Sequence, residues 1–258
     1  MQEFRHRAPQ KKRENMIYGI HPVLEALEAG KEIEKIMLQR DGKSNAFREI
    51  MSLATRLEVP LQKVPSEKLD NLTRGAHQGV VAFVSLVDYQ PIENILMGIY
   101  DNGESPLLII LDRVTDVRNL GAIARTAECA GVHALIVPSR GSALINADAV
   151  KTSAGALNNI AVHRSPNLKE TLQYLKDSGL CIVAVTEHAS NIYYQSDLSG
   201  PLVLILGSEE DGISPEYLKY ADKKVQIPLF GSTGSLNVSV AAGIAIFETL
   251  RQRNSSNL

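Results

Sequence analysis

Beyond residue 105, this 258-residue chain contains three short segments whose residue types could bind or transform a ligand. The first, residues 112–126, offers an amide at Asn119 and a guanidinium at Arg125. We expect Asn119 to cap the helix that follows, because Asn favours that position. Arg125 lies inside the helix among Ala, Ile and Thr, where it could act on a ligand or pair with a surface carboxylate such as Glu128.

The second segment places three acidic residues between Gly207 and Gly212. Its carboxylates, including that of Glu209, could accept hydrogen bonds from hydroxyl or amine groups. The spacing Gly-x-x-x-x-Gly is that of a phosphate loop, but such a loop needs Lys where this chain has Ile213, and carboxylates repel phosphate. No Gly-x-Gly-x-x-Gly follows the apolar strand at residues 107–111, so a dinucleotide site has little support.

The third segment has no charged side chain between Lys224 and Glu248, although it is not uniformly apolar. A short strand leads into a loop of Gly, Ser and Thr at residues 231–235, and then into a helix of small residues. Burying such a loop is costly unless its backbone N–H and C=O groups find partners. The segment therefore predicts a pocket for an adenosine-like or ribose group, a tight helix interface, or both together.

Composition limits the classes of protein that remain. The formal net charge of −2 argues against indiscriminate coating of nucleic acid but allows RNA binding through a local patch. No apolar run approaches the roughly 20 residues that cross a bilayer, and the basic N-terminus lacks the apolar core of a secretion signal. We expect Cys129 and Cys181 to be small buried residues in a reducing compartment. The histidines are dispersed, so we expect no metal site, and we expect a cytoplasmic protein.

Periodicity divides the chain into four parts. Residues 1–15 form a polar, basic tail that is either solvated or in contact with RNA phosphates. Residues 16–88 form a small α/β domain that ends on a strand expected to be buried on both faces, and residues 89–105 are expected to be a linker. In residues 106–258 apolar strands alternate with helices, at 107–111, 134–138, 160–163, 181–186, 202–206 and 224–228. This alternation predicts an α/β fold with a mostly parallel sheet, whose ligands bind at the carboxyl ends of the strands.

The three segments, in this order, resemble the SpoU (TrmH-type) branch of the SPOUT RNA methyltransferases. The first family pattern, Asn-x-Gly-x-x-x-Arg-Thr, is matched by Asn119, Gly121, Arg125 and Thr126. The second, Gly-x-Glu closed by Gly, is matched by Gly207, Glu209 and Gly212. The third, Ser-Leu-Asn-Val-Ser, is matched by residues 235–239. Segments 18–23 and 77–80 resemble the substrate-binding domain of the 23S rRNA guanosine-2′-O-methyltransferase subgroup. One departure is Glu210, where many relatives carry Gly.

The resemblance implies a fold and a cofactor that the residue pattern does not reveal. The C-terminal part is expected to be a SPOUT domain with a deep trefoil knot, and residues 16–88 a ribosomal-protein-L30e-like RNA-binding domain. S-adenosylmethionine is expected in the knot, in contact with Gly207, Ile227 and Leu236. The family works as a homodimer through the C-terminal helix, with an active site shared between the two chains.

The implied reaction is in-line transfer of a sulfonium methyl group to a ribose 2′-hydroxyl of RNA, with a guanosine of 23S rRNA as the expected target. The resemblance assigns catalysis to Arg125, and it assigns orientation of the ribose and the loop to Asn119, Glu209, Ser235 and Asn237. A guanidinium is a poor base at neutral pH, so Arg125 either stabilises the developing alkoxide or acts with an RNA phosphate. The alternatives are a tRNA 2′-O-methyltransferase and a non-catalytic RNA-binding or ribosome-assembly protein on the same fold.

Overall fold

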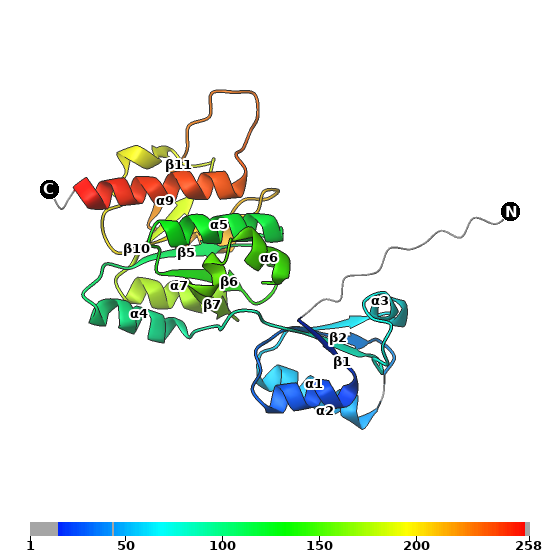
Figure 1. Cartoon of the computed structure of the whole chain (residues 1–258). Helices are drawn as coiled ribbons and strands as arrows, with labels where there is room; N and C mark the ends of the chain where they lie inside the picture. Colours follow the sequence, from blue (N-terminus) through cyan, green and yellow to red (C-terminus); the bar gives the residue numbers. More distant parts are fainter. Residues whose placement is uncertain (1–14, 43, 256–258) are drawn as a thin grey trace.

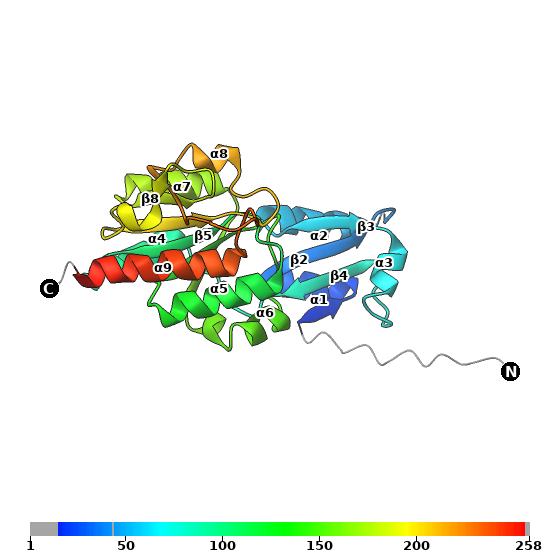
Figure 2. The same ribbon diagram turned by 90° about the horizontal axis from the view of Figure 1, so that it is seen from above.

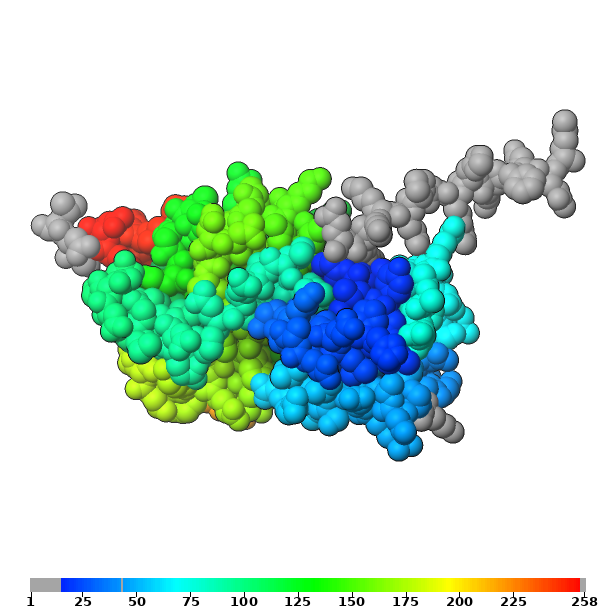
Figure 3. All heavy atoms as spheres, turned by 60° about the horizontal axis from the view of Figure 1, so that its bottom comes forward, coloured from blue at the N-terminus to red at the C-terminus, as the bar shows by residue number. Residues whose placement is uncertain are grey.

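The computed structural model describes residues 15–42 and 44–255, which form two α/β units joined by a single segment (Figure 1). The space-filling view in Figure 3 shows the first unit, blue to cyan, lying directly against the second. The predicted basic tail lies outside these ranges except for Asn15. Within the described ranges, no helix is long and apolar enough to cross a membrane.

The first unit is a four-stranded mixed sheet with helices on both faces. Its elements are β1 (Met16–Tyr18), α1 (Ile20–Glu28), β2 (Ile33–Gln39), α2 (Asn45–Arg56), β3 (Leu61–Val64), α3 (Ser66–Asp70) and β4 (Val80–Val84). The strands lie in the order β1-β4-β2-β3. Because side chains alternate along a strand, Val80 of β4 packs with α1 and α2 whereas Val81 packs with α3. The prediction of a strand buried on both faces is confirmed for β4.

The second unit contains a seven-stranded sheet in which every neighbouring pair is parallel. Its strands are β5 (Leu107–Leu111), β6 (Ala134–Pro138), β7 (Ala161–Ser165), β8 (Cys181–Val185), β9 (Asn191–Ile192), β10 (Leu202–Leu206) and β11 (Lys223–Gln226). They lie in the order β7-β6-β5-β10-β8-β11-β9. The predicted mostly parallel α/β sheet is confirmed, although the short edge strand β9 was not predicted.

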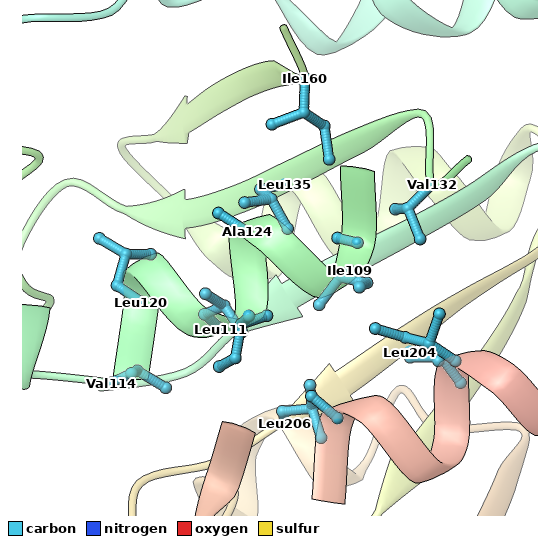
Figure 4. Packing of buried hydrophobic residues seen from close by; sticks show 14 of the residues in the cluster. Ile109, Leu111, Val114, Leu120, Ala124, Val132, Leu135, Ile160, Leu204 and Leu206 are labelled. Carbon is cyan, nitrogen blue, oxygen red and sulfur yellow. The ribbon is translucent and has the colours of Figure 1, made fainter. Parts of the chain in front are cut away.

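Helices cover both faces of this sheet, as Figure 1 shows. One face carries α5 (Val117–Cys129), α6 (Ala147–Thr152) and α9 (Val238–Ser255), and the other carries α4 (Ile92–Asp101), α7 (Leu168–Asp177) and α8 (Pro215–Leu218). Short 3-10 turns occur at Ala156–Asn158 and Tyr193–Gln195. In Figure 4, Leu120 and Ala124 of α5 pack over Leu111 of β5, and Figure 2 shows α9 alongside α5.

Most of the segment predicted as a linker, residues 89–105, is helix α4. Its apolar positions recur with helical spacing and are buried against the sheet of the second unit, at Ile92, Ile95, Leu96 and Ile99. The segment therefore contributes to the core of the second unit, and the chain between the two sheets is shorter than the sequence suggested.

Two local expectations are wrong. Asp116, not Asn119, caps α5: its carboxylate Oδ1 accepts a hydrogen bond from the Arg118 N–H at 2.7 Å. Asn119 lies inside the first turn of the helix, so its amide is free to bind elsewhere. Cys129 is exposed and Cys181 is half-buried, because the apolar positions of their elements that face the core belong to other residues.

Candidate active site

Three side chains, one from each predicted segment, meet at the carboxyl ends of the central strands β5 and β10. Asn119 Nδ2 donates to Glu209 Oε1 at 2.9 Å, and Asn237 Nδ2 donates to the same oxygen at 2.6 Å. Asn237 Nδ2 also lies 3.0 Å from Asn119 Oδ1, which accepts from it. A carboxylate that receives two amide donors is held in one orientation. These contacts bring together residues that the sequence separates by 90 and 28 positions.

The orientation of the Asn237 amide is fixed by the start of α9. Its Oδ1 accepts from the Ser239 N–H at 2.9 Å and from the Ser239 hydroxyl at 2.5 Å. Because the amide oxygen is occupied by two donors, the nitrogen must point toward Glu209. The Asn-Val-Ser sequence thus holds the Asn237 amide so that its nitrogen donates to the Glu209 carboxylate.

Gly121 explains how Asn119 comes to face Glu209. A Cβ at this position would lie 2.7 Å from Thr152 Cβ and 2.8 Å from the Ala149 carbonyl oxygen. Helix α5 therefore packs on α6 more closely than any other residue would permit. The close approach sets the position of the first turn of α5, where Asn119 is buried with 9% of its surface exposed.

The loop that carries Glu209 is closed by its two glycines. Ser208 and Gly212 exchange backbone hydrogen bonds of 3.1 Å in both directions, and Gly212 adopts a φ of +64° that favours glycine. A Cβ on Gly207 would lie 2.1 Å from the Gly212 carbonyl carbon. The loop is therefore compact, and its conformation requires Gly207.

Asp112 and Arg113, at the carboxyl end of β5, brace this loop from the other side. Asp112 is 1% exposed, and its Oδ2 accepts from the Ser214 N–H at 2.6 Å. The Arg113 guanidinium donates to Asp211 Oδ2 at 3.0 Å and to the Gly212 carbonyl at 3.1 Å. Arg113 has a φ of 55°, a strained conformation for a residue with a side chain. The strained turn aims its side chain at the loop.

A shallow hollow beside this cluster collects the predicted cofactor residues that follow β11. Ile227, Ser235 and Leu236 share it with residues from the carboxyl end of β8, from the loop after β11 and from α9, namely Val185, Thr186, Glu187, Leu229 and Ala241. Gly207 does not line the hollow but follows β10, the strand next to β8. The lining is mostly apolar, with the Thr186 and Ser235 hydroxyls and the Glu187 carboxylate, so it suits a ligand with an apolar body and a few polar groups.

A second hollow, of about 280 Å³, is lined by Glu209 itself. Its lining includes Arg113, Asp116, Asn119, Glu209 and Glu210. Glu210 is exposed and forms part of the rim, so the residue that departs from the family pattern lies beside the carboxylate cluster. Among the described residues, no group of His, Cys, Asp or Glu side chains is arranged to hold a metal ion.

Arg125 stands apart from the cluster. It lies six residues beyond Asn119 on α5, and its side chain is exposed. Within residues 15–42 and 44–255 it forms no hydrogen bond or ion pair, so the alternative of a surface ion pair with Glu128 is wrong. Ser235 is likewise exposed in the loop before α9. The described residues thus bring together Asn119, Glu209 and Asn237, whereas Arg125 is exposed away from them and Ser235 lines the hollow beside Leu236.

Comparison with protein families identifies the pattern that these residues follow. Residues 106–247, which contain all three segments, match the model of the SpoU rRNA Methylase family. The chain belongs to this family. Residues 16–90 match a second model, described as RNA 2'-O ribose methyltransferase substrate binding.

Individual relatives in the SpoU family match along most of the chain. The 23S rRNA (guanosine-2'-O-)-methyltransferase RlmB of Photorhabdus laumondii is 40% identical over 93% of this chain and 99% of its own length. The enzyme of the same name from Escherichia coli K12 is 38% identical over 93% and 99%. The crystal structure of the SpoU methyltransferase AviRb from Streptomyces viridochromogenes with AdoMet has a TM-score of 0.60, with 26% identity over 93% of this chain and 90% of that one. The A. aeolicus TrmH/SpoU tRNA modifying enzyme has a TM-score of 0.55 and 32% identity, over 64% of this chain and 86% of that one.

Asp112 and Arg113 are the site residues that sequence reasoning missed in this SpoU chain. They begin the first segment, but we assigned them no role there. Two charged residues directly after a fully apolar strand are a usable signal, because a buried strand end rarely carries charge without a partner. What the sequence could not reveal is that the partners lie about a hundred residues away, in residues 211–214.

Proposed function

We propose that this chain transfers a methyl group from S-adenosylmethionine to the ribose 2′-hydroxyl of a guanosine in 23S rRNA. The observation that carries the proposal is the convergence of Asn119, Glu209 and Asn237 at the carboxyl ends of β5 and β10. Ligands of open parallel sheets bind at such strand ends. Relatives named as 23S rRNA (guanosine-2'-O-)-methyltransferases, similar over 93% of the chain, support the choice of reaction and substrate.

The residues beside the cluster fit S-adenosylmethionine. Ile227 and Leu236 offer apolar contact to an adenosyl group, and the hollow they line carries hydroxyl groups but few charges. Gly207 would allow the backbone of its loop to approach the ligand closely, since it has no Cβ. When bound, the cofactor supplies an electrophilic methyl group. No metal ion has a part in the proposal.

We assign the reaction centre to five residues. Asn119, Glu209 and Asn237 form the fixed polar cluster that orients the ribose, and Ser235 extends it from the loop. Most of the rate gain then comes from holding the 2′-hydroxyl in line with the methyl group. Arg125 provides a cation that stabilises the developing alkoxide, directly or through an RNA phosphate, since a guanidinium does not act as a base at neutral pH.

We further propose that the chain works as a homodimer through its C-terminal domain. The first half of α9, residues 238–247, is apolar on its outer side as well as its inner side: Ala245 and Ile246 are buried, yet Val240 and Phe247 are 50% and 52% exposed. A helical stretch that is apolar all round is normally covered on every side. Phe230, in the loop before α9, is 98% exposed. A second copy would cover these side chains, and an active site shared between copies would give the outward-facing Arg125 a partner.

The finer architecture belongs to the same proposal. We propose a trefoil knot in residues 106–258, supported by the strand order β10-β8-β11 and by the return of α9 onto α5. We propose that residues 16–88, a ribosomal-protein-L30e-like unit, select the RNA, that residues 89–105 connect the units, and that the protein acts in the cytoplasm. The match of residues 16–90 to a substrate-binding model supports the first part.

The two alternatives are less well supported. The relative titled a tRNA modifying enzyme matches 64% of this chain, whereas the relatives named as 23S rRNA enzymes match 93%. A non-catalytic scaffold would have no use for the hydrogen-bonded cluster of Asn119, Glu209 and Asn237. Mapping of ribose 2′-O-methyl groups in rRNA and tRNA from cells lacking the protein separates the three: a missing rRNA guanosine methyl is expected, a missing tRNA methyl favours the first alternative, and an unchanged map favours the scaffold.

Substitution of Arg125 tests the assignment of catalysis. We expect Arg125→Ala to abolish methylation of a 23S rRNA transcript while S-adenosylmethionine binding, measured by calorimetry, persists, because Arg125 lies outside the cofactor hollow. The matched control is Arg118→Ala, which removes an exposed arginine side chain from the same helix. Turnover of Arg125→Ala equal to that of the wild type would contradict the assignment.

A further inference from the structure

The contact between the two units is centred on Arg164, in β7 at the edge of the parallel sheet. Its Nη1 donates to the Ile33 carbonyl at 2.9 Å and its Nη2 to the Glu34 carbonyl at 2.5 Å. Both carbonyls belong to β2 of the first unit. The Arg164 side chain is 11% exposed, although it lies between two units that each have a core of their own. A planar guanidinium that binds two adjacent carbonyls permits one relative orientation of its partners.

In the first unit, Glu34 provides the carboxylate that faces the Arg164 guanidinium. Its carboxylate Oε2 lies 4.0 Å from Arg164 Nη1, and its side chain is 4% exposed. The Tyr89 hydroxyl donates to Glu34 Oε1, and the Arg164 guanidinium lies over the Tyr89 ring, 5.3 Å from its centre. Tyr89 belongs to the connecting segment. The cluster of Glu34, Tyr89 and Arg164, called the joint below, therefore contains one residue from each unit and one from the chain between them.

The connecting segment is also fixed to β7 by its backbone. The Gln90 N–H donates to the Val162 carbonyl at 2.9 Å, and His163 Nδ1 donates to the Gln90 carbonyl at 2.9 Å. These bonds leave the chain little freedom at the point where it enters the second unit. A flexible tether needs no such contacts, since an unpaired, solvated linker would connect the units equally well.

Burying the ionisable side chains of the joint costs free energy. Burial raises the pKa of Glu34, even though the hydrogen bond from Tyr89 and the charge of Arg164 favour the carboxylate. Buried ion pairs seldom add stability relative to apolar packing, and their best-supported use is to specify one arrangement. None of the three residues lines the hollows beside Glu209 or Leu236. Their role is therefore not chemistry at the reaction centre.

We propose that the joint of Glu34, Tyr89 and Arg164 fixes the orientation of the RNA-selecting unit relative to the reaction centre, and that Glu34 and Arg164 are positioning residues that determine which nucleotide of the bound RNA is methylated. The inference rests on the proposed function, in which the first unit holds the RNA. RNA bound to one rigid unit presents a single ribose to the other only if the two units keep one orientation, and small misplacements of a reacting group are costly.

The first experiment measures the geometry without any substrate. Spin labels attached at Glu49→Cys in α2 and Gln173→Cys in α7, with the native cysteines replaced by Ser, report the distance between the units when labelled chains are mixed with an excess of unlabelled protein, so that a homodimer carries one labelled chain. We expect a single narrow distance distribution in the otherwise wild-type protein and a broad one with Arg164→Ala or Arg164→Lys, since Lys keeps the charge but not the two-pronged contact. A distribution unchanged by both variants would overturn the joint. This measurement remains informative even if the proposed methyl transfer is wrong.

The second experiment measures positioning in the reaction. We expect Arg164→Lys and Tyr89→Phe, which preserve most of the packing, to lower kcat/KM for a 23S rRNA transcript about 10- to 100-fold. We also expect methyl groups to spread from one nucleotide to its neighbours, while S-adenosylmethionine binding stays unchanged. The matched control is Lys169→Ala, which removes a cation whose ion pair with Glu216 lies within the second unit. Wild-type kcat/KM and an unspread methylation map in both variants would contradict positioning by the joint.

Discussion

At the scale of single residues, the site depends on where side chains are absent as much as on where they are present. Gly207 and Gly121 have no Cβ, so the acidic loop folds tightly on itself and α5 packs closely on α6. Glu209 and Asn119 are thereby brought to hydrogen-bonding distance. Both hydrogen bonds to Glu209 from the two amides end on Oε1. Oε2 accepts no hydrogen bond from the described residues, and we expect it to receive the ribose hydroxyl.

We predict that Gly207→Ala lowers the free energy of unfolding by about 1–3 kcal/mol, because its Cβ would meet backbone atoms that cannot rotate away. S-adenosylmethionine binding should weaken as well, since the loop must open. Urea unfolding and calorimetry measure the two effects. The matched control is Gly200→Ala, because a Cβ at Gly200 meets nothing within 4 Å. Equal stability of the two variants would show that the loop tolerates a side chain at Gly207.

At the scale of elements, β7 has two roles that its sequence does not separate. Its apolar residue Val162 packs in the core of the second unit, whereas His163 and Arg164 bind the connecting segment and the first unit. Strand alternation places Val162 and Arg164 on one face of the sheet and His163 on the other. Because β7 is the outermost strand of the sheet, Arg164 can reach the first unit while Val162 packs in the core. The segment predicted as a linker is also held against this sheet, because α4 packs on it and Gln90 is hydrogen-bonded to β7.

His163 should make the stability of this element depend on pH. Burial lowers the pKa of His163 below its ordinary value of 6.5, because it disfavours the imidazolium, although the Gln90 carbonyl and Glu93 oppose the shift. As pH falls below about 6.5, the unfolded chain gains a proton that the folded chain does not, so stability falls until the lowered pKa is reached, with a slope of up to about 1.4 kcal/mol per pH unit. Urea unfolding between pH 7.5 and 5 measures it.

The matched pair for this test is His163→Gln and His188→Gln. Gln at position 163 can still donate to the Gln90 carbonyl but does not titrate, so we expect a flatter pH dependence in that variant. The His188 side chain is 86% exposed, and its replacement should leave the wild-type slope. If His163→Gln kept the full slope, another group would be responsible.

At the scale of the whole molecule, the exposed apolar side chains are concentrated in the part of the chain that contains the site. Leu229, Phe230, Leu236, Val240 and Phe247 all lie in or next to the uncharged third segment. Both readings of that segment from the sequence, a ligand pocket and a packing surface, remain compatible with the structure. The hollow that contains Leu236 lies beside the carboxyl ends of β8 and β11, and the exposed apolar side chains continue along α9.

We predict that Phe247→Asp converts the protein from a dimer to a monomer, because a carboxylate in an apolar interface loses its hydration without gaining a partner. Sedimentation velocity of the wild type and the variant at the same concentration measures the change. Met97→Asp is the matched control, since Met97 is 60% exposed on α4, on the opposite face of the sheet. A monomeric wild type, or a dimeric Phe247→Asp, would contradict the proposed homodimer.

The local pattern of the chain predicted much of the fold. Unbroken apolar runs such as residues 107–111 and 202–206 have the length and composition of buried strands, and their alternation with helices allows few architectures. The three motifs that contain Asn119, Glu209 and Asn237 indicated the family. The predictions of the sheet and of the family succeed because periodicity and the spacing within each motif depend on neighbours within a few turns of chain.

Only the tertiary structure decided which side chains meet. The sequence predicted Asn119 as the helix cap, but Asp116 caps α5 and the Asn119 amide donates to Glu209. The charges of Asp112 and Arg113 were visible after their strand, but their partners in the acidic loop were not, and the joint has no local signature. In the joint, the Arg164 hydrogen bond to the Glu34 carbonyl spans 130 residues. Such contacts depend on how α5 packs, on sheet order and on how the two units dock, which are settled by the burial of apolar surface over the whole chain and not by any short stretch of it.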